Sequence, residues 1–374
     1  MVIDALQPLG ETELGSLAPK RDRWARVPSR RKECVKVSLR VAVVGAGFMG
    51  QLHARIIAES ESATLVAVVE MKEEAGKPVA EQYGVRYFRD VSEALRDSGT
   101  DAFIVAVPDR LHVNVACALL IAGKPVLLEK PMAHSLAAAR QIAQAADRGG
   151  ARLMIGHNLR FDPRYVGAAR AVADGLIGEP IHSKAGRISS RVIGTRMNGA
   201  SSVLFYLGVH DADAIQWVSG RSIRRVYSRA VSRLMPALGV QSEDAILSVV
   251  DFEDGSIGQL FNGWTRATVD PVIIDGRLEV HGTEGVVEID VRDHGLRIWS
   301  SDGLVLPDGL HWPEVNGRIR GDTAAEVHHF VRAVQDDSPF VMSVAEAMRA
   351  VAVNDAILHS VESGMPEDVE PVGV

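Results

Sequence analysis

The sequence lacks the features that mark secreted, membrane-spanning or nucleic-acid-binding proteins. Two cysteines, Cys34 and Cys117, are too few for a disulfide framework and favour a reducing cytoplasm. Charge, Gly or Pro breaks every hydrophobic stretch before it reaches the roughly 20 residues that span a bilayer, so we expect no membrane association. The 41 Lys and Arg against 48 Asp and Glu give a net charge of −7, which does not support nucleic-acid binding. Internal repeats and low-complexity segments are also missing.

What remains is the composition of an ordinary enzyme, 47% hydrophobic and 24% charged. A length of 374 residues predicts two domains. They are preceded by an N-terminal extension, residues 1–37, without the apolar core of a secretory signal. We interpret the extension as a mobile or interface-packing arm, with anion binding as the alternative. Its basic residues are Lys20, Arg21, Arg23, Arg26, Arg30, Arg31, Lys32 and Lys36.

Residues 38–157 alternate apolar strands with helical segments, the pattern of a doubly wound parallel sheet of the Rossmann type. Gly84 and Gly123 stand where helix C-caps are expected. The predicted strands are 41–44, 65–69, 85–88, 102–107, 125–128 and 152–155, and the crossover helices include 75–83 and 113–122.

Residues 158–374 follow a different pattern, which predicts an α+β domain with a large, mostly antiparallel sheet. We expect the second of two closing helices to be N-capped by Ser343 and the first by Asp322. The glycine, asparagine and serine content of 192–202 indicates a mobile loop. Predicted helices are 163–174, 203–218, 323–334 and 344–362; predicted strands are 223–233, 245–252 and 256–265, with a hairpin of 278–281 and 286–289.

A GxGxxG turn, Gly45 to Gly50, joins the first predicted strand to the first helix and predicts a dinucleotide site. Gly45 allows the tight turn, Gly47 allows close approach of the pyrophosphate, and Gly50 allows close helix packing. Phe48 and Met49 belong to the same site because free N–H groups at the helix start face the phosphates. On its own the motif is weak evidence, because a glycine-rich segment often only reverses the chain direction and binds no nucleotide.

An acid at the end of the second strand strengthens this prediction. Glu70 stands twenty residues beyond Gly50, where a carboxylate hydrogen-bonds the adenosine ribose; a solvated strand end is the alternative. Because a carboxylate repels a 2′-phosphate, we expect NAD rather than NADP. The nearby Lys72 weakens that preference.

Two polar turns follow strands four and five, where ligands of open α/β sheets bind. The first reads Ala106-Val107-Pro108-Asp109-Arg110-Leu111-His112 and the second Glu129-Lys130-Pro131. Proline after Lys130 favours an extended backbone that aims the ammonium group along the strand into the cleft. Spacing alone fits a surface lysine equally well.

These motifs, with Gly208-Val209-His210-Asp211-Ala212-Asp213 some eighty residues later, resemble the Gfo/Idh/MocA family of glucose-fructose oxidoreductases and inositol dehydrogenases. The resemblance covers roughly residues 38–362. It implies a Rossmann domain, a second domain with an open sheet, pairing through that sheet into homodimers or homotetramers, and oxidation of a hydroxyl by a nicotinamide dinucleotide.

The resemblance also implies roles for single residues. Lys130 would lie between nicotinamide and substrate, and His210 would face the reacting hydroxyl from the second domain. Asp213 would be a substrate ligand or a local scaffold. Cofactor contacts are implied for Pro108, His112 and Glu129.

One position departs from the family pattern. Many members that oxidise polyols carry Asp four residues before the histidine, where this chain has Tyr206. Residues four apart on a helix share a face, so Tyr206 is expected to point toward His210, where its phenol either takes part in proton transfer or only packs. Lys130 and His210 are the expected catalytic pair, because the oxidation needs a proton acceptor and only histidine titrates near neutral pH unaided.

Several other polar residues have two interpretations each. Asn158 is expected to contact substrate, and Arg160 either does so or forms a hinge or interdomain salt bridge. Arg187 and Asp244 could reach sugar hydroxyls. His328 and His329 diverge by about 100° on a helix and cannot chelate together, so no metal site is predicted. Cys117 is interpreted as a core residue.

The predicted function is an NAD-dependent dehydrogenase for a secondary hydroxyl of a sugar, amino sugar, nucleotide sugar or cyclitol. One alternative is a redox-neutral NAD-dependent glycosidase or lyase, in which the hydride returns after cleavage. Another is a dinucleotide-binding sensor without turnover.

Overall fold

The computed structural model describes residues 38–97, 99–292 and 294–373. The basic N-terminal residues and Cys34 lie outside these residues. No helix among the described residues is long and apolar enough to cross a membrane.

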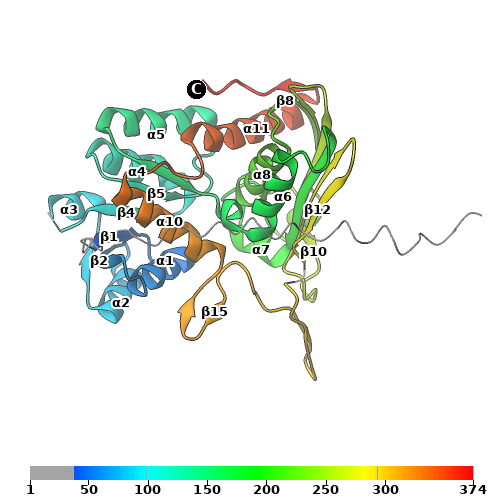
Figure 1. Ribbon diagram of the computed structural model, residues 1–374. Helices are drawn as coiled ribbons and strands as arrows, with labels where there is room; N and C mark the ends of the chain where they lie inside the picture. Colours follow the sequence, from blue (N-terminus) through cyan, green and yellow to red (C-terminus); the bar gives the residue numbers. More distant parts are fainter. Residues whose placement is uncertain (1–37, 98, 293, 374) are drawn as a thin grey trace, which may run out of the picture. The chain divides into compact units, whose positions relative to one another are not determined.

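The first sheet has six parallel strands in the order β3-β2-β1-β4-β5-β6 (Figure 1). All six predicted strands are present, although the fourth ends at Val105 rather than residue 107. Their β-branched residues are buried on both faces, as in a doubly wound sheet. The bounds are β1 Leu39–Val44, β2 Ala63–Val69, β3 Arg86–Phe88, β4 Ala102–Val105, β5 Val126–Glu129 and β6 Leu153–Gly156.

Two helices from the end of the chain complete the covering of this sheet. On one face α10 packs beside α1 and α2; on the other α11 packs beside α4 and α5 (Figure 1). Gly84 caps α2 as predicted, whereas the C-cap of α4 is Ala122, one residue before Gly123. The bounds are α1 Phe48–Ala58, α2 Glu73–Tyr83, α3 Val91–Arg96, α4 His112–Ile121, α5 Leu136–Gly149, α10 Asp322–Asp336 and α11 Val344–Ser363.

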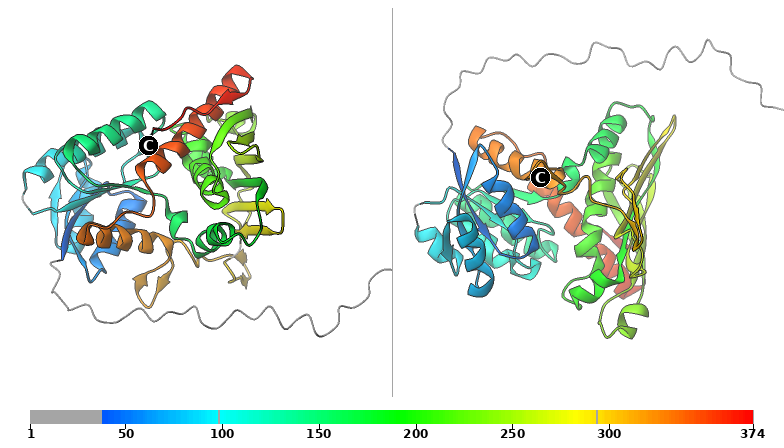
Figure 2. Two further views of the ribbon diagram at one scale, coloured as in Figure 1. Left: turned by 45° about the horizontal axis from the view of Figure 1, so that its top comes forward. Right: turned by 90° about the horizontal axis from the view of Figure 1, so that it is seen from below.

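The second sheet has seven strands in the order β12-β11-β7-β10-β9-β8-β17, and only β7 and β10 pair in parallel. The predicted hairpin is confirmed, with Leu278 opposite Ile289. Helices α6, α8 and α11 pack on one face, and no helix of the described residues covers the other face (Figure 2). The bounds are α6 Pro163–Ala173, α8 Val209–Ser219, β7 Pro180–Ser190, β8 Ile223–Val231, β9 Ala245–Phe252, β10 Ile257–Arg266, β11 Ile274–Gly282, β12 Val286–Asp290 and β17 Glu367–Asp368.

Short elements connect these layers. In the first domain η2, Asp109–Leu111, follows β4. In the second domain there are three such elements: η3 Asn158–Phe161, α7 Arg191–Met197 and α9 Leu234–Ala237. Two small hairpins follow the large sheet, β13 Ile298–Ser300 with β14 Gly303–Val305, and β15 Glu314–Val315 with β16 Arg318–Ile319.

Two local predictions were wrong. Residues 191–197 form the helix α7, because the Ser190 side chain accepts from the Val192 N–H and caps it. The N-cap of α10 is Gly321, since Asp322 is already helical. The helical segment expected over 203–218 is confirmed, although its first turn, η4 Leu204–Gly208, is π-helical and precedes α8. The cap at Ser343 is confirmed, as a capping box with Glu346.

Candidate active site

The glycine turn has the geometry that close approach to a dinucleotide requires. Gly45 has φ +99°, and a Cβ added there would lie 2.4 Å from the Ala106 carbonyl oxygen. A Cβ at Gly50 would lie 1.9 Å from the Gly45 carbonyl oxygen, whereas nothing lies within 4 Å of one at Gly47. The cap residue Gly47 has no side chain to bond, so the N–H groups of Phe48 and Met49 at the start of α1 are available to an anion.

Glu70 lies directly beside this turn. Its Oε2 accepts a hydrogen bond of 2.9 Å from the Ala46 N–H, and its Oε1 accepts one of 3.0 Å from the Lys72 N–H. A carboxylate accepts about four hydrogen bonds, so both oxygens keep capacity for a ribose hydroxyl.

The turns after β4 and β5 are joined by a buried histidine. The ring nitrogens of His112 lie 2.8 Å from the Pro131 carbonyl oxygen and 3.1 Å from that of Val107. Burial lowers the pKa of His112, so its ring is neutral and can donate to only one of the two carbonyls at a time. His112 therefore connects the two turns through its hydrogen bonds. The predicted contacts of Pro108 and His112 with the nicotinamide stay predictions.

Glu129 and Lys130 point in opposite directions from the end of β5. Glu129 Oε1 lies 2.7 Å from Nε2 of the buried His53 on α1. Burial alone would raise the pKa of Glu129, but the hydrogen bond and charge of His53 outweigh it and lower that pKa. The carboxylate therefore faces α1, and its predicted contact with the cofactor stays a prediction. His53 is a partner that no sequence motif indicated.

Lys130 faces the second domain. Its Nζ donates a 3.0 Å hydrogen bond to the Tyr206 carbonyl oxygen and lies 5.0 Å from the centre of the Tyr206 ring. Burial lowers the pKa of Lys130, the charge of Arg187 lowers it further, and Glu129 opposes both. A lysine in this setting gives up a proton more easily than a free one.

His210, in the first turn of α8, lies near enough to Lys130 to be affected by its charge. Its Nδ1 is buried without a hydrogen-bond partner among the described residues, and its ring centre lies 6.4 Å from that of His157. Burial, followed by the charges of Lys130 and Arg187, holds the pKa of His210 well below its usual value. The imidazole is therefore neutral at physiological pH and free to accept a proton.

The predicted proton role of the Tyr206 phenol stays a prediction. The π-helical turn η4 runs directly into α8, so Tyr206 and His210 lie about one turn apart in a continuous helical segment. The Tyr206 ring packs 5.7 Å from the ring of Trp264, and its hydroxyl lies 3.5 Å from Nη2 of Arg196. Among the described residues no hydrogen bond or ring contact joins Tyr206 to His210. Its backbone carbonyl, rather than its phenol, lies at the centre of the site.

Arg160 and Asp213 form a salt bridge between elements. The guanidinium of Arg160, in η3, donates bonds of 3.0 and 2.6 Å to Asp213 on α8, and its Nη1 reaches Glu346 at 3.1 Å. Burial opposes the charge on Asp213, but Arg160 outweighs it and lowers the Asp213 pKa. Of the alternatives weighed from the sequence, these contacts favour a scaffold for Asp213. The salt bridges of Arg160 to Asp213 and Glu346 lie within residues 158–374 and do not join the two predicted domains.

Three further predicted residues lie in different surroundings. Asn158 donates a long, 3.4 Å hydrogen bond to Asp322, while its Oδ1 is buried without a partner among the described residues. Arg187 is buried and donates to Asp211 and to the Tyr165 hydroxyl. The prediction that Asp244 reaches substrate was wrong, because its carboxylate accepts the backbone N–H groups of residues 233–235.

Comparison with known proteins identifies the fold and its cofactor. Residues 39–157 match the family model described as "Oxidoreductase family, NAD-binding Rossmann fold" (Gfo/Idh/MocA), and residues 165–288 match that of the Gfo/Idh/MocA C-terminal domain. The chain is 33% identical to an inositol 2-dehydrogenase of Saccharopolyspora erythraea, covering 89% of this chain and 96% of the relative. It is 28% identical to an inositol 2-dehydrogenase of Rubrobacter xylanophilus, covering 88% and 93%.

A solved structure supports the same conclusion. GenD2 from gentamicin A biosynthesis, crystallised in complex with NAD, has a TM-score of 0.78 and 27% identity. The match covers 91% of this chain and 99% of that one. The fold, the oxidoreductase class and the dinucleotide cofactor predicted from the sequence are thereby confirmed.

Proposed function

Because the chain belongs to the Gfo/Idh/MocA family of NAD-binding oxidoreductases, we propose that it oxidises a secondary hydroxyl of a sugar or cyclitol. Relatives named inositol 2-dehydrogenase and D-apiose dehydrogenase support this substrate class. NAD, when bound, accepts the hydride at its nicotinamide ring. The chain's own residues must bind the hydroxyl and remove its proton.

The single observation that carries this proposal is that Lys130 Nζ, at the carboxyl end of the first sheet, bonds the Tyr206 carbonyl oxygen one helical turn before His210. Lys130 is a half-buried cation with a lowered pKa, and His210 is a neutral imidazole whose Nδ1 has no partner among the described residues. In our proposal Lys130 binds and polarises the hydroxyl oxygen while His210 accepts its proton. General-base assistance of this kind contributes about 10² to 10⁴ in rate.

Cofactor contacts are proposed for the turn Gly45 to Gly50 and for the strand ends. Gly47, Phe48 and Met49 would hold the pyrophosphate, and Glu70 would accept from the ribose hydroxyls. The proposed domain division is the one predicted from the sequence, namely an extension 1–37, a cofactor domain 38–157 and a substrate domain 158–374. Helices α10 and α11 then return to cover the first sheet.

We further propose that the protein is cytoplasmic and forms a homodimer or homotetramer through the open face of the second sheet. Apolar side chains stand exposed on that face, among them Leu247, Val249 and Ile257. Leu247→Lys would then reduce the oligomer to smaller species in analytical ultracentrifugation. An unchanged sedimentation coefficient would place the interface elsewhere.

The activity is tested by supplying NAD with a panel of cyclitols, free sugars, amino sugars and nucleotide sugars and following NADH at 340 nm. We expect NADH to accumulate with at least one member of the panel. Conversion of a sugar without net NADH would favour the redox-neutral alternative, and NAD binding without conversion of any substrate would favour the sensor.

A further inference from the structure

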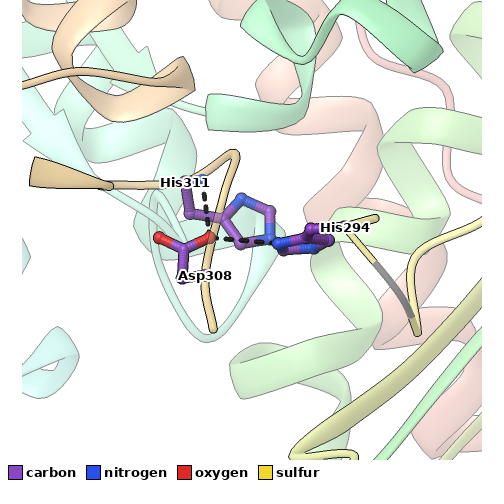
Figure 3. A group of neighbouring side chains, drawn as sticks. All are labelled: His294, Asp308 and His311. Atoms are coloured by element: carbon purple, nitrogen blue, oxygen red, sulfur yellow. Dashed lines mark hydrogen bonds and ion pairs between the residues drawn. The ribbon is translucent and has the colours of Figure 1, made fainter. Parts of the chain in front are cut away.

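Three side chains outside the proposed Lys130 and His210 pair bring electron-pair donors to one point. His294 follows β12, and Asp308 and His311 lie in the segment between β14 and β15 (Figure 3). One nitrogen or oxygen atom of each lies within 4.8 Å of the other two. His294 Nδ1 is 3.3 Å from Asp308 Oδ1.

The hydrogen bonds around the two imidazoles define which nitrogens carry lone pairs. His311 Nδ1 lies 2.7 Å from Asp322 Oδ2; since a carboxylate only accepts, Nδ1 carries the proton and Nε2 of the neutral ring has a free lone pair. The Gly309 N–H donates to His294 Nδ1 at 3.0 Å, so this nitrogen carries no proton, and a metal ion bound there would replace the Gly309 N–H as the partner of its lone pair. Two imidazole lone pairs and a carboxylate oxygen thus face one another, and a cation between them would balance their charge.

We propose that His294, Asp308 and His311 bind a divalent transition-metal ion of the zinc class. Nitrogen and carboxylate oxygen are ligands that zinc prefers, and bonds of about 2.0–2.1 Å at tetrahedral angles place neighbouring ligand atoms about 3.3 Å apart. His294 Nδ1 and Asp308 Oδ1 lie at this separation. Because Oδ1 already accepts two backbone N–H groups, a metal ion would bind the free acceptor position of Oδ2 or displace one of those donors. Three protein ligands leave one coordination position for water.

Hydrogen bonds from neighbouring residues hold two of the three ligand side chains, His311 and Asp308, in place before a metal ion binds. Asp322, whose side chain is fully buried, holds His311 by its Nδ1, the arrangement that orients most metal-binding histidines. Asp308 accepts the backbone N–H groups of Leu310, His311 and Trp312, which fix its carboxylate while leaving about one of its four acceptor positions free. The two carboxylates supply the charge that a divalent ion needs. No sequence motif indicated this cluster, because its members come from separate loops.

The test uses the full chain, purified with a tag that contains no histidine and stripped of metal with a chelator. Titration with Co²⁺ should give a visible d–d absorption band that saturates at one ion per chain and disappears when Zn²⁺ is added. His294→Ala and His311→Ala should abolish the band, and Asp322→Asn should weaken binding about 10- to 100-fold.

The matched control is His281→Ala. His281 also stacks on a second imidazole, that of His182, and lies 3.4 Å from the Glu279 carboxylate, but it is on the second sheet. This variant should bind Co²⁺ like the unaltered protein. NADH fluorescence titration of every variant shows that the cofactor domain is folded.

Two results would overturn the proposal. One is a protein that takes up no Co²⁺ or Zn²⁺ at micromolar concentration, which would mean that a proton on His311 balances the cluster instead. The other is stoichiometric binding that survives both histidine substitutions or shows a thiolate charge-transfer band from Cys34 or Cys117. Either result would leave the proposed dehydrogenase activity standing, since that is measured separately by NADH formation.

Discussion

Replacing Lys130 by methionine tests the centre of the proposed mechanism. Methionine keeps most of the length of the side chain but removes the ammonium group that donates to the Tyr206 carbonyl oxygen. Loss of a group that binds and polarises the reacting hydroxyl should lower kcat by about 10² to 10³, which is about 2.7 to 4.1 kcal/mol at 1.36 kcal/mol per decade.

The same substitution should change stability little. The Tyr206 carbonyl loses its donor, which costs about 1 to 3 kcal/mol. In return the protein no longer buries an ammonium group whose pKa burial has lowered. We therefore expect the free energy of unfolding in urea to shift by less than about 2 kcal/mol, with NADH affinity within about threefold of the unaltered protein.

Two further variants separate charge from proton chemistry. Lys130→Arg keeps the positive charge but cannot release a proton, so it should also be slow if Lys130 takes part in proton transfer. Lys77→Met removes an exposed lysine that pairs with Glu73 on α2 and should leave kcat unchanged. The reasoning fails if K130M keeps kcat within about threefold, measured as initial NADH formation with saturating NAD and substrate.

Three other substitutions test separate parts of the structure. D213N removes the charged hydrogen bonds from Arg160 to Asp213 but leaves Arg160 paired with Glu346, so it should cost about 1.5 to 3 kcal/mol in urea unfolding. Because the pKa of Asp213 is lowered on folding, this contribution is present above the unfolded pKa near 3.9 and is lost as pH falls through the folded value. Equal midpoints for both proteins at pH 7 would refute it. Y206F should keep kcat within about threefold, since the phenol makes only a 3.5 Å contact, and a loss beyond tenfold would assign it a proton role. E70S combined with M71R should shift kcat/KM toward NADP, and an unaltered protein that already prefers NADP would contradict the ribose contact proposed for Glu70.

The doubly wound sheet could be predicted because its strands are buried on both faces and each ends in a recognisable turn. The order of Gly45, Glu70 and Lys130 along the chain then placed the candidate cofactor and substrate groups at one edge. The resemblance carried by Lys130-Pro131 and His210 supplied the pairing of the two domains' residues, which spacing alone did not.

What could not be predicted depends on contacts between distant segments. The π-helical turn at Leu204–Gly208 has no sequence pattern of its own, so the bond from Lys130 Nζ to the Tyr206 carbonyl oxygen was not expected. The sequence does not distinguish Asp244 from a surface acid, because the three backbone N–H groups that bond to its carboxylate come from residues 233–235, on a different segment. His294 and His311 meet through two loops whose course follows from packing rather than from periodicity.

The strand end at Glu129 and Lys130 also has a consequence for how distant parts of the protein influence one another. Successive side chains at a strand end leave on opposite sides, so one points to His53 on α1 and the other to the Tyr206 carbonyl beyond the sheet. The buried Glu326 on α10 adds a second carboxyl near Glu129, whose charge raises the Glu326 pKa in addition to burial. The charge of Glu129 raises the Lys130 pKa, so a change in the interior of the first domain that neutralises Glu129 would lower that pKa without any movement of Lys130.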